Sequence, residues 1–147
     1  MEIDLPDAAA TERLGAMVSD LLRPGDAVCL WGPLGAGKST LARGLIRALT
    51  TPEEDVPSPT FTLVQFYRGR DFPIAHFDLY RVTRPDEAFE IGLDEALDEG
   101  AVLIEWPERL SRGLPRDRLD ITLSMEGDRR RAKIARQGAW EARPFEL

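Results

Sequence analysis

Hydrophobic positions follow two different periods along the chain, and their succession predicts an α/β protein. Short apolar runs, typical of buried parallel strands, occupy residues 27–31 and 101–105. Apolar residues three and four apart predict one helix between Asp7, its expected N-cap, and Pro24-Gly25, and a second helix over residues 41–49. The helices and strands alternate, which favours helices packed on a largely parallel sheet.

The remaining segments predict shorter elements. Residues 2–5 fit a short edge strand, and residues 62–68 and 72–80 fit two strands that form an antiparallel hairpin or lie side by side. A helix is expected from Pro85 to Gly92, with a further turn or helix at residues 93–97. Alternation on both sides of Gly127-Asp128 predicts a C-terminal hairpin with one solvent-exposed face, appended to the core.

The glycine-rich segment at residues 32–39, GPLGAGKS, matches G-x-x-x-x-G-K-[ST], the phosphate-binding P-loop or Walker A motif. Its glycines allow positive φ angles and a close approach of main-chain N–H groups to a phosphate, next to the positive end of a helix. Lys38 would bind the β- and γ-phosphates, and the Ser39 hydroxyl would bind Mg²⁺. The competing interpretation is a plain glycine turn between a strand and a helix.

Composition favours the functional interpretation of this motif. The chain has 17 Arg and only two Lys, so Lys stands at the one position where a slender point charge is needed. The residues expected to contact the nucleotide are Thr11, Pro33, Leu34, Gly35, Ala36, Gly37, Lys38, Ser39 and Thr40. The chain length and the order of the expected helices and strands predict a single domain over residues 1–147. Its expected fold is the three-layer P-loop NTPase fold, in which a mixed sheet has a parallel core and an antiparallel C-terminal hairpin.

Two acids end apolar strands and would face the same ligand. In open α/β sheets the ligand lies beyond the carboxyl ends of the strands, where Asp78 and Glu105 are expected. Glu105 follows the more hydrophobic strand, as in a Walker B segment, and is assigned first to Mg²⁺ together with Ser39. Asp78 would orient the attacking water, although the two roles can be exchanged.

Other polar residues offer weaker indications. Thr60 or Thr62 lies where switch loops bring a hydroxyl to Mg²⁺ and the γ-phosphate, but Pro59 equally suits a simple strand entry. Thr11 and Glu12 would face the nucleotide base or form a solvated helix face. His76, the only histidine, is expected to be a packed strand residue, and Trp106 either shields the site or packs.

Composition and charge limit the ligands and the cellular compartment that suit this chain. The net charge is −7, with an acidic segment at residues 71–108 and a basic one at residues 112–143, which argues against broad nucleic-acid binding by this chain alone. No apolar run is long enough for a membrane span, and the acidic N-terminus is unlike a signal peptide. Cys29, the only cysteine, is expected in the core, so the composition suits the cytoplasm.

Four segments of the chain are informative together: GAGKST at residues 35–40, SPTFTL at 58–63, HFDLYR at 76–81 and IEWP at 104–107. In this order they resemble the bacterial tRNA threonylcarbamoyladenosine biosynthesis ATPases of the TsaE family. The resemblance covers most of residues 7–110, says nothing of the Arg-rich end, and departs at Pro33, where the family has an acidic or other polar residue. Pro33 has no N–H to offer a phosphate.

The resemblance implies a cytoplasmic ATPase that binds ATP and Mg²⁺. It implies Ser39 and Glu105 at Mg²⁺, Asp78 in catalysis, Thr60 in the switch and the region of Thr11 at the base. It also implies partners of the TsaB and TsaD type, which would hold most of the tRNA, and no membrane. Catalytic roles are therefore expected for Lys38, Thr60, Asp78 and Glu105. Hydrolysis is expected to be weak without the partners, because no arginine of this chain is clearly positioned as a finger.

Two other functions use the same motif. A small-molecule or nucleotide kinase would transfer the phosphoryl group to an acceptor. The chain leaves little length for the lid of such a kinase, although Arg129, Arg130 and Arg131 could be assigned to it. A guanine-nucleotide switch would need an N-K-x-D base-recognition motif, which the sequence lacks.

Overall fold

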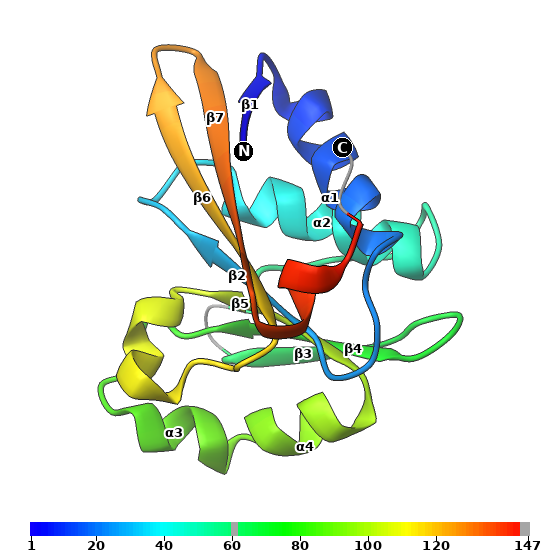
Figure 1. The fold of residues 1–147 in the computed structure, drawn as a ribbon, viewed down its shortest axis with the longest axis vertical. Coiled ribbons are helices and arrows are strands. Elements are labelled where there is room, and N and C mark those ends of the chain that lie inside the picture. The colour runs from blue at the N-terminus through cyan, green and yellow to red at the C-terminus, as the bar shows by residue number, and fades with distance from the viewer. Residues whose placement is uncertain (60–61, 145–147) are drawn as a thin grey trace.

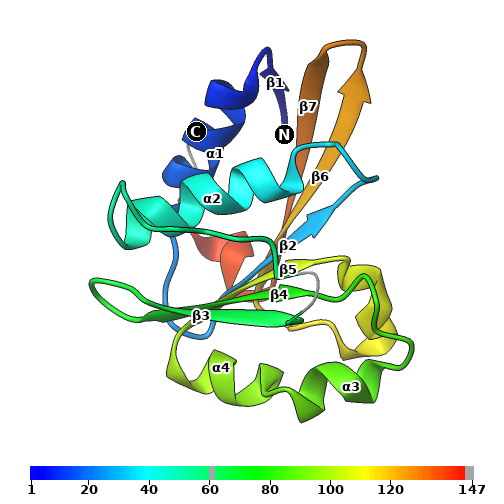
Figure 2. The same cartoon turned by 180° about the vertical axis from the view of Figure 1, so that it is seen from behind.

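The computed structural model of the protein describes residues 1–59 and 62–144. It shows a twisted β-sheet with helices on both faces (Figures 1 and 2). The strands are β1 (Glu2–Leu5), β2 (Ala27–Trp31), β3 (Val64–Arg68), β4 (Pro73–Asp78), β5 (Ala101–Glu105), β6 (Arg118–Glu126) and β7 (Arg129–Gln137). The helices are α1 (Ala8–Ser19), α2 (Lys38–Leu49), α3 (Pro85–Glu90) and α4 (Leu93–Glu99), with 3₁₀ segments at Pro107–Gly113 and Gly138–Ala142.

The sheet has the strand order β1-β7-β6-β2-β5-β4-β3. The four inner strands β6, β2, β5 and β4 run parallel, and antiparallel pairs close both edges. The expected mixed sheet, parallel core and two hairpins are therefore confirmed. The C-terminal hairpin is not an appendage, however, because residues 118–122 of β6 pair with the whole of β2, so the hairpin extends the central sheet. The alternation of polar and apolar residues along a strand indicates which face of the strand is exposed to solvent, but it does not indicate which strand lies beside it.

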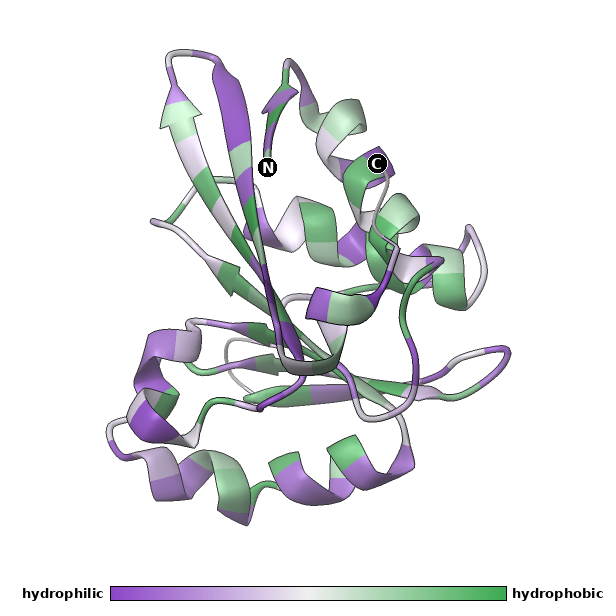
Figure 3. Cartoon of the chain, viewed as in Figure 1, coloured by the Kyte–Doolittle hydropathy of each residue, from purple (hydrophilic) through white to green (hydrophobic). Residues whose placement is uncertain are grey.

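Two helical layers bury the two faces of this sheet. Helices α1 and α2 cover one face and share a core with β2, β5 and the hairpin, whereas α3 and α4 cover the other face. The strands β2 and β5 are buried almost throughout, and β7 alternates between buried and exposed positions. Figure 3 shows this contrast as hydrophobic colouring in the centre of the sheet and mostly hydrophilic colouring along β7.

Close contact between α1 and α2 fixes the helix that follows the glycine-rich loop. Asp7 caps α1 as expected, and its carboxylate accepts the N–H of Ala10 at 2.8 Å. A Cβ atom on Gly15 would overlap the Leu41 carbonyl oxygen, and one on Gly44 would overlap that of Glu12. These two glycines let the helix backbones touch, so α1 holds α2 at a fixed height above the sheet.

The C-terminal segment is tied to the start of β2. The Arg143 guanidinium binds the buried Asp26 carboxylate, with Nη2 2.8 Å from Oδ1, and lies over the ring of the buried Trp140. These contacts lie at the end of the sheet opposite the glycine-rich loop. Among the described residues, none of the helices has both the length and the apolar character that crossing a membrane requires.

Candidate functional site

The loop between β2 and α2 turns through three glycines with positive φ. These angles are 138° at Gly32, 81° at Gly35 and 104° at Gly37, which directly precedes the first residue of α2. Gly32 lies against the Leu123 carbonyl of β6, where there is no room for a side chain. The backbone thus curls around the N-terminus of α2, the geometry in which free N–H groups and the helix dipole attract an anion.

Two other residues of the loop, Pro33 and Ala36, are joined by a main-chain hydrogen bond within the turn. The Ala36 N–H donates to the Pro33 carbonyl at 3.2 Å, and the Ala36 side chain is fully buried. Neither residue is among those that line the two cavities described below. Pro33 has no N–H to donate to a ligand.

Lys38 begins α2 and folds back over the loop. Its Nζ donates to the Gly32 carbonyl at 2.7 Å and lies 3.5 Å from the centroid of the Trp106 ring. Only 5% of Lys38 is exposed. Burial lowers the pKa of its ammonium group, and the negative charge of Glu105 acts in the opposite direction. The Lys38 ammonium group is thus held beside the glycine-rich loop by an uncharged carbonyl and an aromatic ring, and an anionic ligand could replace the carbonyl as its partner.

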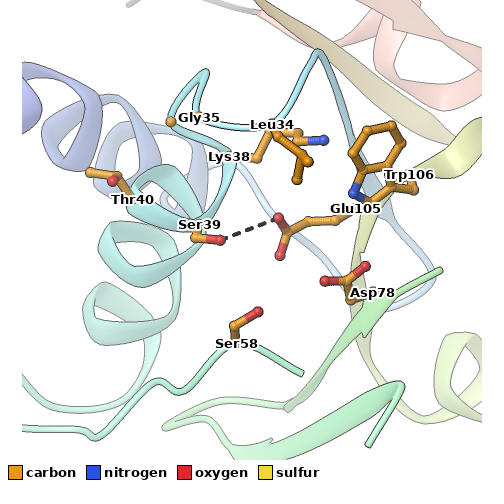
Figure 4. A pocket seen from close by; sticks show the side chains of 10 residues that line it. Leu34, Gly35, Lys38, Ser39, Thr40, Ser58, Asp78, Glu105 and Trp106 are labelled. Atoms are coloured by element: carbon orange, nitrogen blue, oxygen red, sulfur yellow. Dashed lines mark hydrogen bonds between the residues drawn. The ribbon is translucent and has the colours of Figure 1, made fainter. Parts of the chain in front are cut away.

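The two predicted acids lie side by side at the carboxyl ends of adjacent parallel strands. Asp78 of β4 is in register with Glu105 of β5, and both are buried. The Glu105 Oε1 accepts a long hydrogen bond of 3.4 Å from the Ser39 hydroxyl, which comes from the first turn of α2. The Asp78 Oδ1 accepts the N–H of Tyr80 at 3.0 Å. The expected placement of both acids opposite the loop is confirmed (Figure 4).

These groups surround one cavity of about 280 Å³. Its lining residues are Leu34, Gly35, Gly37, Lys38, Ser39, Thr40, Ser58, Asp78, Glu105 and Trp106. Most of the residues expected to contact phosphate and metal therefore meet at one place. Ser58 was not expected there; it comes from the loop before β3, and its side chain points toward the space between Ser39 and Asp78 (Figure 4).

Thr11 belongs to a smaller neighbouring cavity of about 160 Å³. This cavity lies between the start of α1, the glycine-rich loop and the tip of the β6–β7 hairpin, and Gly35, Gly37 and Thr40 line both cavities. Asp128 and Arg130 form its hairpin side. Glu12, expected beside Thr11, is not there: it forms an ion pair with Arg43 at 3.5 Å, because one helical step turns it toward the outer side of α2.

The expected switch threonines are only partly covered by the structure. Thr60 lies outside the described residues. Thr62 is exposed and accepts the Gln65 amide N–H at 3.2 Å, and it does not line the cavity.

The structure adds contacts for Trp106 and His76 that the sequence did not predict. Trp106 packs with Tyr80 at a centroid distance of 4.9 Å and covers Lys38, so it both packs and shields the site. His76 is buried as expected, but its Nε2 lies 2.7 Å from the Glu105 Oε2. The sequence indicated only that His76 and Asp78 share a face of β4; the contact with Glu105 depends on strand pairing.

The oxygen atoms around the larger cavity suit a hard cation with few protein ligands. The Ser39 hydroxyl and the Glu105 carboxylate already approach each other, and Asp78 is adjacent in the sheet. Within residues 1–59 and 62–144, no cluster of three or more His, Cys, Asp or Glu side chains could enclose a metal. Mg²⁺ is commonly bound by one or two protein oxygens together with phosphate and water, so these residues fit it as part of a nucleotide complex.

Comparison with known proteins gives a consistent result. The sequence profile described as "Threonylcarbamoyl adenosine biosynthesis protein TsaE" matches residues 5–133. The chain is similar to tRNA threonylcarbamoyladenosine biosynthesis protein TsaE from Rickettsia felis, with 36% identity over 82% of this chain and 71% of that protein. The Synechocystis protein of the same name is 42% identical over 75% of this chain and 72% of its own length.

A solved structure supports the fold. The crystal structure of Bacillus subtilis YdiB superposes with a TM-score of 0.80 and 28% sequence identity, over 96% of this chain and 88% of that one. The Bacillus subtilis TsaE sequence is 36% identical over 80% of this chain and 73% of that protein.

Proposed function

Because the chain belongs to the TsaE family of threonylcarbamoyl adenosine biosynthesis proteins, we propose that it is a Mg²⁺-dependent ATPase that acts in the threonylcarbamoylation of tRNA adenosine. Its sheet and glycine-rich loop would make it a P-loop NTPase in fold. The observation that carries the proposal is the convergence of Lys38, Ser39 and Glu105 on one cavity at the N-terminus of α2. Each of the three supplies a different group that a bound nucleoside triphosphate requires.

The loop would bind the triphosphate through main-chain N–H groups. Lys38 would exchange its hydrogen bond with the Gly32 carbonyl for one with the β- and γ-phosphates, which restores a full counter-charge to the buried ammonium group. Thr11 and Thr40 line the adjoining smaller cavity, where the adenine base would lie against the tip of the β6–β7 hairpin.

Ser39 and Glu105 would hold Mg²⁺ between them. When bound, the cation would neutralise charge on the phosphate oxygens. Asp78, adjacent to Glu105, would orient the attacking water and accept a hydrogen bond from it. Trp106 would keep bulk water away from the Lys38 side of the cavity, which strengthens the electrostatic contacts there.

We expect the isolated chain to hydrolyse ATP slowly, because of the residues that line the larger cavity. In the part of the chain that the structure describes, no arginine lines the larger cavity, so no side chain is placed to act as an arginine finger. We therefore expect partners of the TsaB and TsaD type to raise the rate in the cytoplasm. Because the chain has a net charge of −7, which disfavours contact with the phosphate backbone, we expect those partners to hold most of the tRNA.

The test compares the only two lysines of the chain. Lys38→Ala should weaken binding of a fluorescent ATP analogue by about 10- to 100-fold, the worth of one or two charge-assisted contacts. Lys133→Ala, on the exposed face of β7, is the matched control and should bind normally. Release of γ-phosphate to water should rise when TsaB- and TsaD-type proteins are added. Equal binding by both variants, or transfer of the phosphate to a small acceptor, would contradict the proposal.

A further inference from the structure

His76 is a buried polar residue that the proposed chemistry does not use. It lies on β4 two residues before Asp78, and alternation places both on the face covered by α1 and α2. Only 1% of the residue is exposed. A strand position in a core of this kind is ordinarily filled by an apolar side chain.

The imidazole contacts one oxygen of the carboxylate whose other oxygen faces Ser39. Its Nε2 lies 2.7 Å from the Glu105 Oε2, whereas the Ser39 hydroxyl lies 3.4 Å from Oε1. A carboxylate that holds a cation only accepts hydrogen bonds, so this role of Glu105 requires the ring nitrogen to be the donor. With Oε2 fixed in this way, the direction of Oε1 toward α2 is fixed too.

Packing alone would favour an apolar side chain at this position, because the second ring nitrogen of His76 is left unsatisfied. The His76 Nδ1 is buried and has no hydrogen-bond partner within the described residues. Leaving a buried polar atom unsatisfied is unfavourable, and such atoms in native proteins call for an explanation. Among the described residues, the one polar contact of the ring is therefore the contact between Nε2 and the Glu105 Oε2.

Given the proposed function, on which this inference rests, we propose that His76 is a positioning residue that orients Glu105 for the cation of the nucleotide complex. It donates from Nε2 to Oε2 and so leaves Oε1 directed at the space beside Ser39. It does not contact the nucleotide. Histidine–carboxylate contacts of this kind around metal sites typically change metal affinity or activity by about 10- to 100-fold when they are removed.

The first experiment measures Mg²⁺ dependence in three variants. His76→Leu removes the donor, His76→Gln retains an N–H donor, and Ile74→Ala removes packing from the same strand and face without touching the site. We expect His76→Leu to raise the Mg²⁺ concentration for half-maximal ATP turnover by about 10- to 100-fold. Binding of the ATP analogue in EDTA should be unchanged, His76→Gln should recover most of the loss, and Ile74→Ala should keep the normal Mg²⁺ dependence.

The second experiment tests the geometry without relying on turnover. Because the chain has a single histidine, a long-range ¹H–¹⁵N spectrum contains one imidazole spin system. We expect the Nε2–H tautomer, and we expect its resonances to move in Glu105→Gln. An Nδ1–H tautomer would overturn the proposal.

The outcomes distinguish the role of His76 from the proposed function. Normal Mg²⁺ dependence in His76→Leu, measured beside a parent protein that requires Mg²⁺, would overturn the role of His76 alone. A parent protein whose ATP turnover does not require Mg²⁺ would overturn the proposed function, and the positioning role with it. A loss in His76→Leu that Ile74→Ala reproduces would show a packing effect and would overturn the positioning role.

Discussion

The ammonium nitrogen of Lys38 lies 3.5 Å from the centroid of the Trp106 ring. The two residues come from different elements, since Lys38 begins α2 and Trp106 directly follows β5. Trp106 has a positive φ of 60°, a backbone conformation that is uncommon for an aromatic residue. The indole covers the Lys38 ammonium group, which also donates to the Gly32 carbonyl of the glycine-rich loop.

The buried position of Lys38 predicts a specific pH dependence. Burial lowers its pKa below the ordinary lysine value of 10.5, against the opposing charge of Glu105. Between the lowered pKa and 10.5 the folded protein binds fewer protons than the unfolded chain, so stability should rise with pH across this window. The limiting slope is about 1.4 kcal/mol per pH unit.

Lysine labelled with ¹³C at Cε would measure this directly, because only two side chains give signals. The Lys38 signal, assigned with Lys133→Arg, should titrate with a midpoint below 10.5. The rise in urea-unfolding free energy over the same window should be lost in Lys38→Met. A Lys38 midpoint at or above 10.5 would contradict the prediction.

Glycines in the loop should differ sharply in how they tolerate alanine. At Gly35 an added Cβ meets nothing within 4 Å, so Gly35→Ala should cost only the strain of a positive φ, about 1–2 kcal/mol. At Gly32 the Cβ would overlap the Leu123 carbonyl oxygen, and backbone cannot move aside cheaply. Gly32→Ala should therefore cost more than about 3 kcal/mol, beyond the usual range for single substitutions. Urea unfolding of both variants would measure the difference, and equal costs would refute it.

The buried ion pair between Asp26 and Arg143 should stabilise the end of the sheet far from the loop. Arg143→Ala leaves the Asp26 carboxylate buried without its cation and should lower the unfolding free energy by about 3–5 kcal/mol. Adding Asp26→Asn should recover part of this loss. The exposed pair of Arg131 with Asp4 is the control, and Arg131→Ala should cost less than about 1 kcal/mol. Similar costs for the buried and the exposed pair would contradict the prediction.

The two acids should separate in kinetic experiments. Glu105 faces Ser39, so Glu105→Gln should raise the Mg²⁺ requirement by about 10-fold or more while sparing nucleotide binding in EDTA. Asp78→Asn should lower turnover at saturating Mg²⁺ by about 10²- to 10⁴-fold, the range for a lost general base. Measuring turnover against Mg²⁺ concentration in both variants tests the assignment. The opposite pattern would exchange the two roles.

Local chemistry explains which parts of the site could be predicted from the sequence. The spacing of Gly35, Gly37 and Lys38 defines a loop that ends in a helix, and the apolar run before Glu105 defines a buried strand with an acid at its end. These are properties of neighbours in the chain, so periodicity and turn chemistry are enough to recognise them. His76 was expected to be only a packed residue because nothing in its neighbourhood indicates that β4 lies beside β5.

The sequence by itself therefore determined the alternation of helices and strands, the glycine-rich loop and the two acids at strand ends. Only the tertiary structure decided that β6 lies against β2, that Ser58 reaches the cavity, that Glu12 turns away from Thr11, and that His76 binds Glu105. The physical reason is that strand order and register bring together residues far apart in the chain. Local patterns specify which face of each element is buried, and packing of the whole sheet selects the neighbour that buries it.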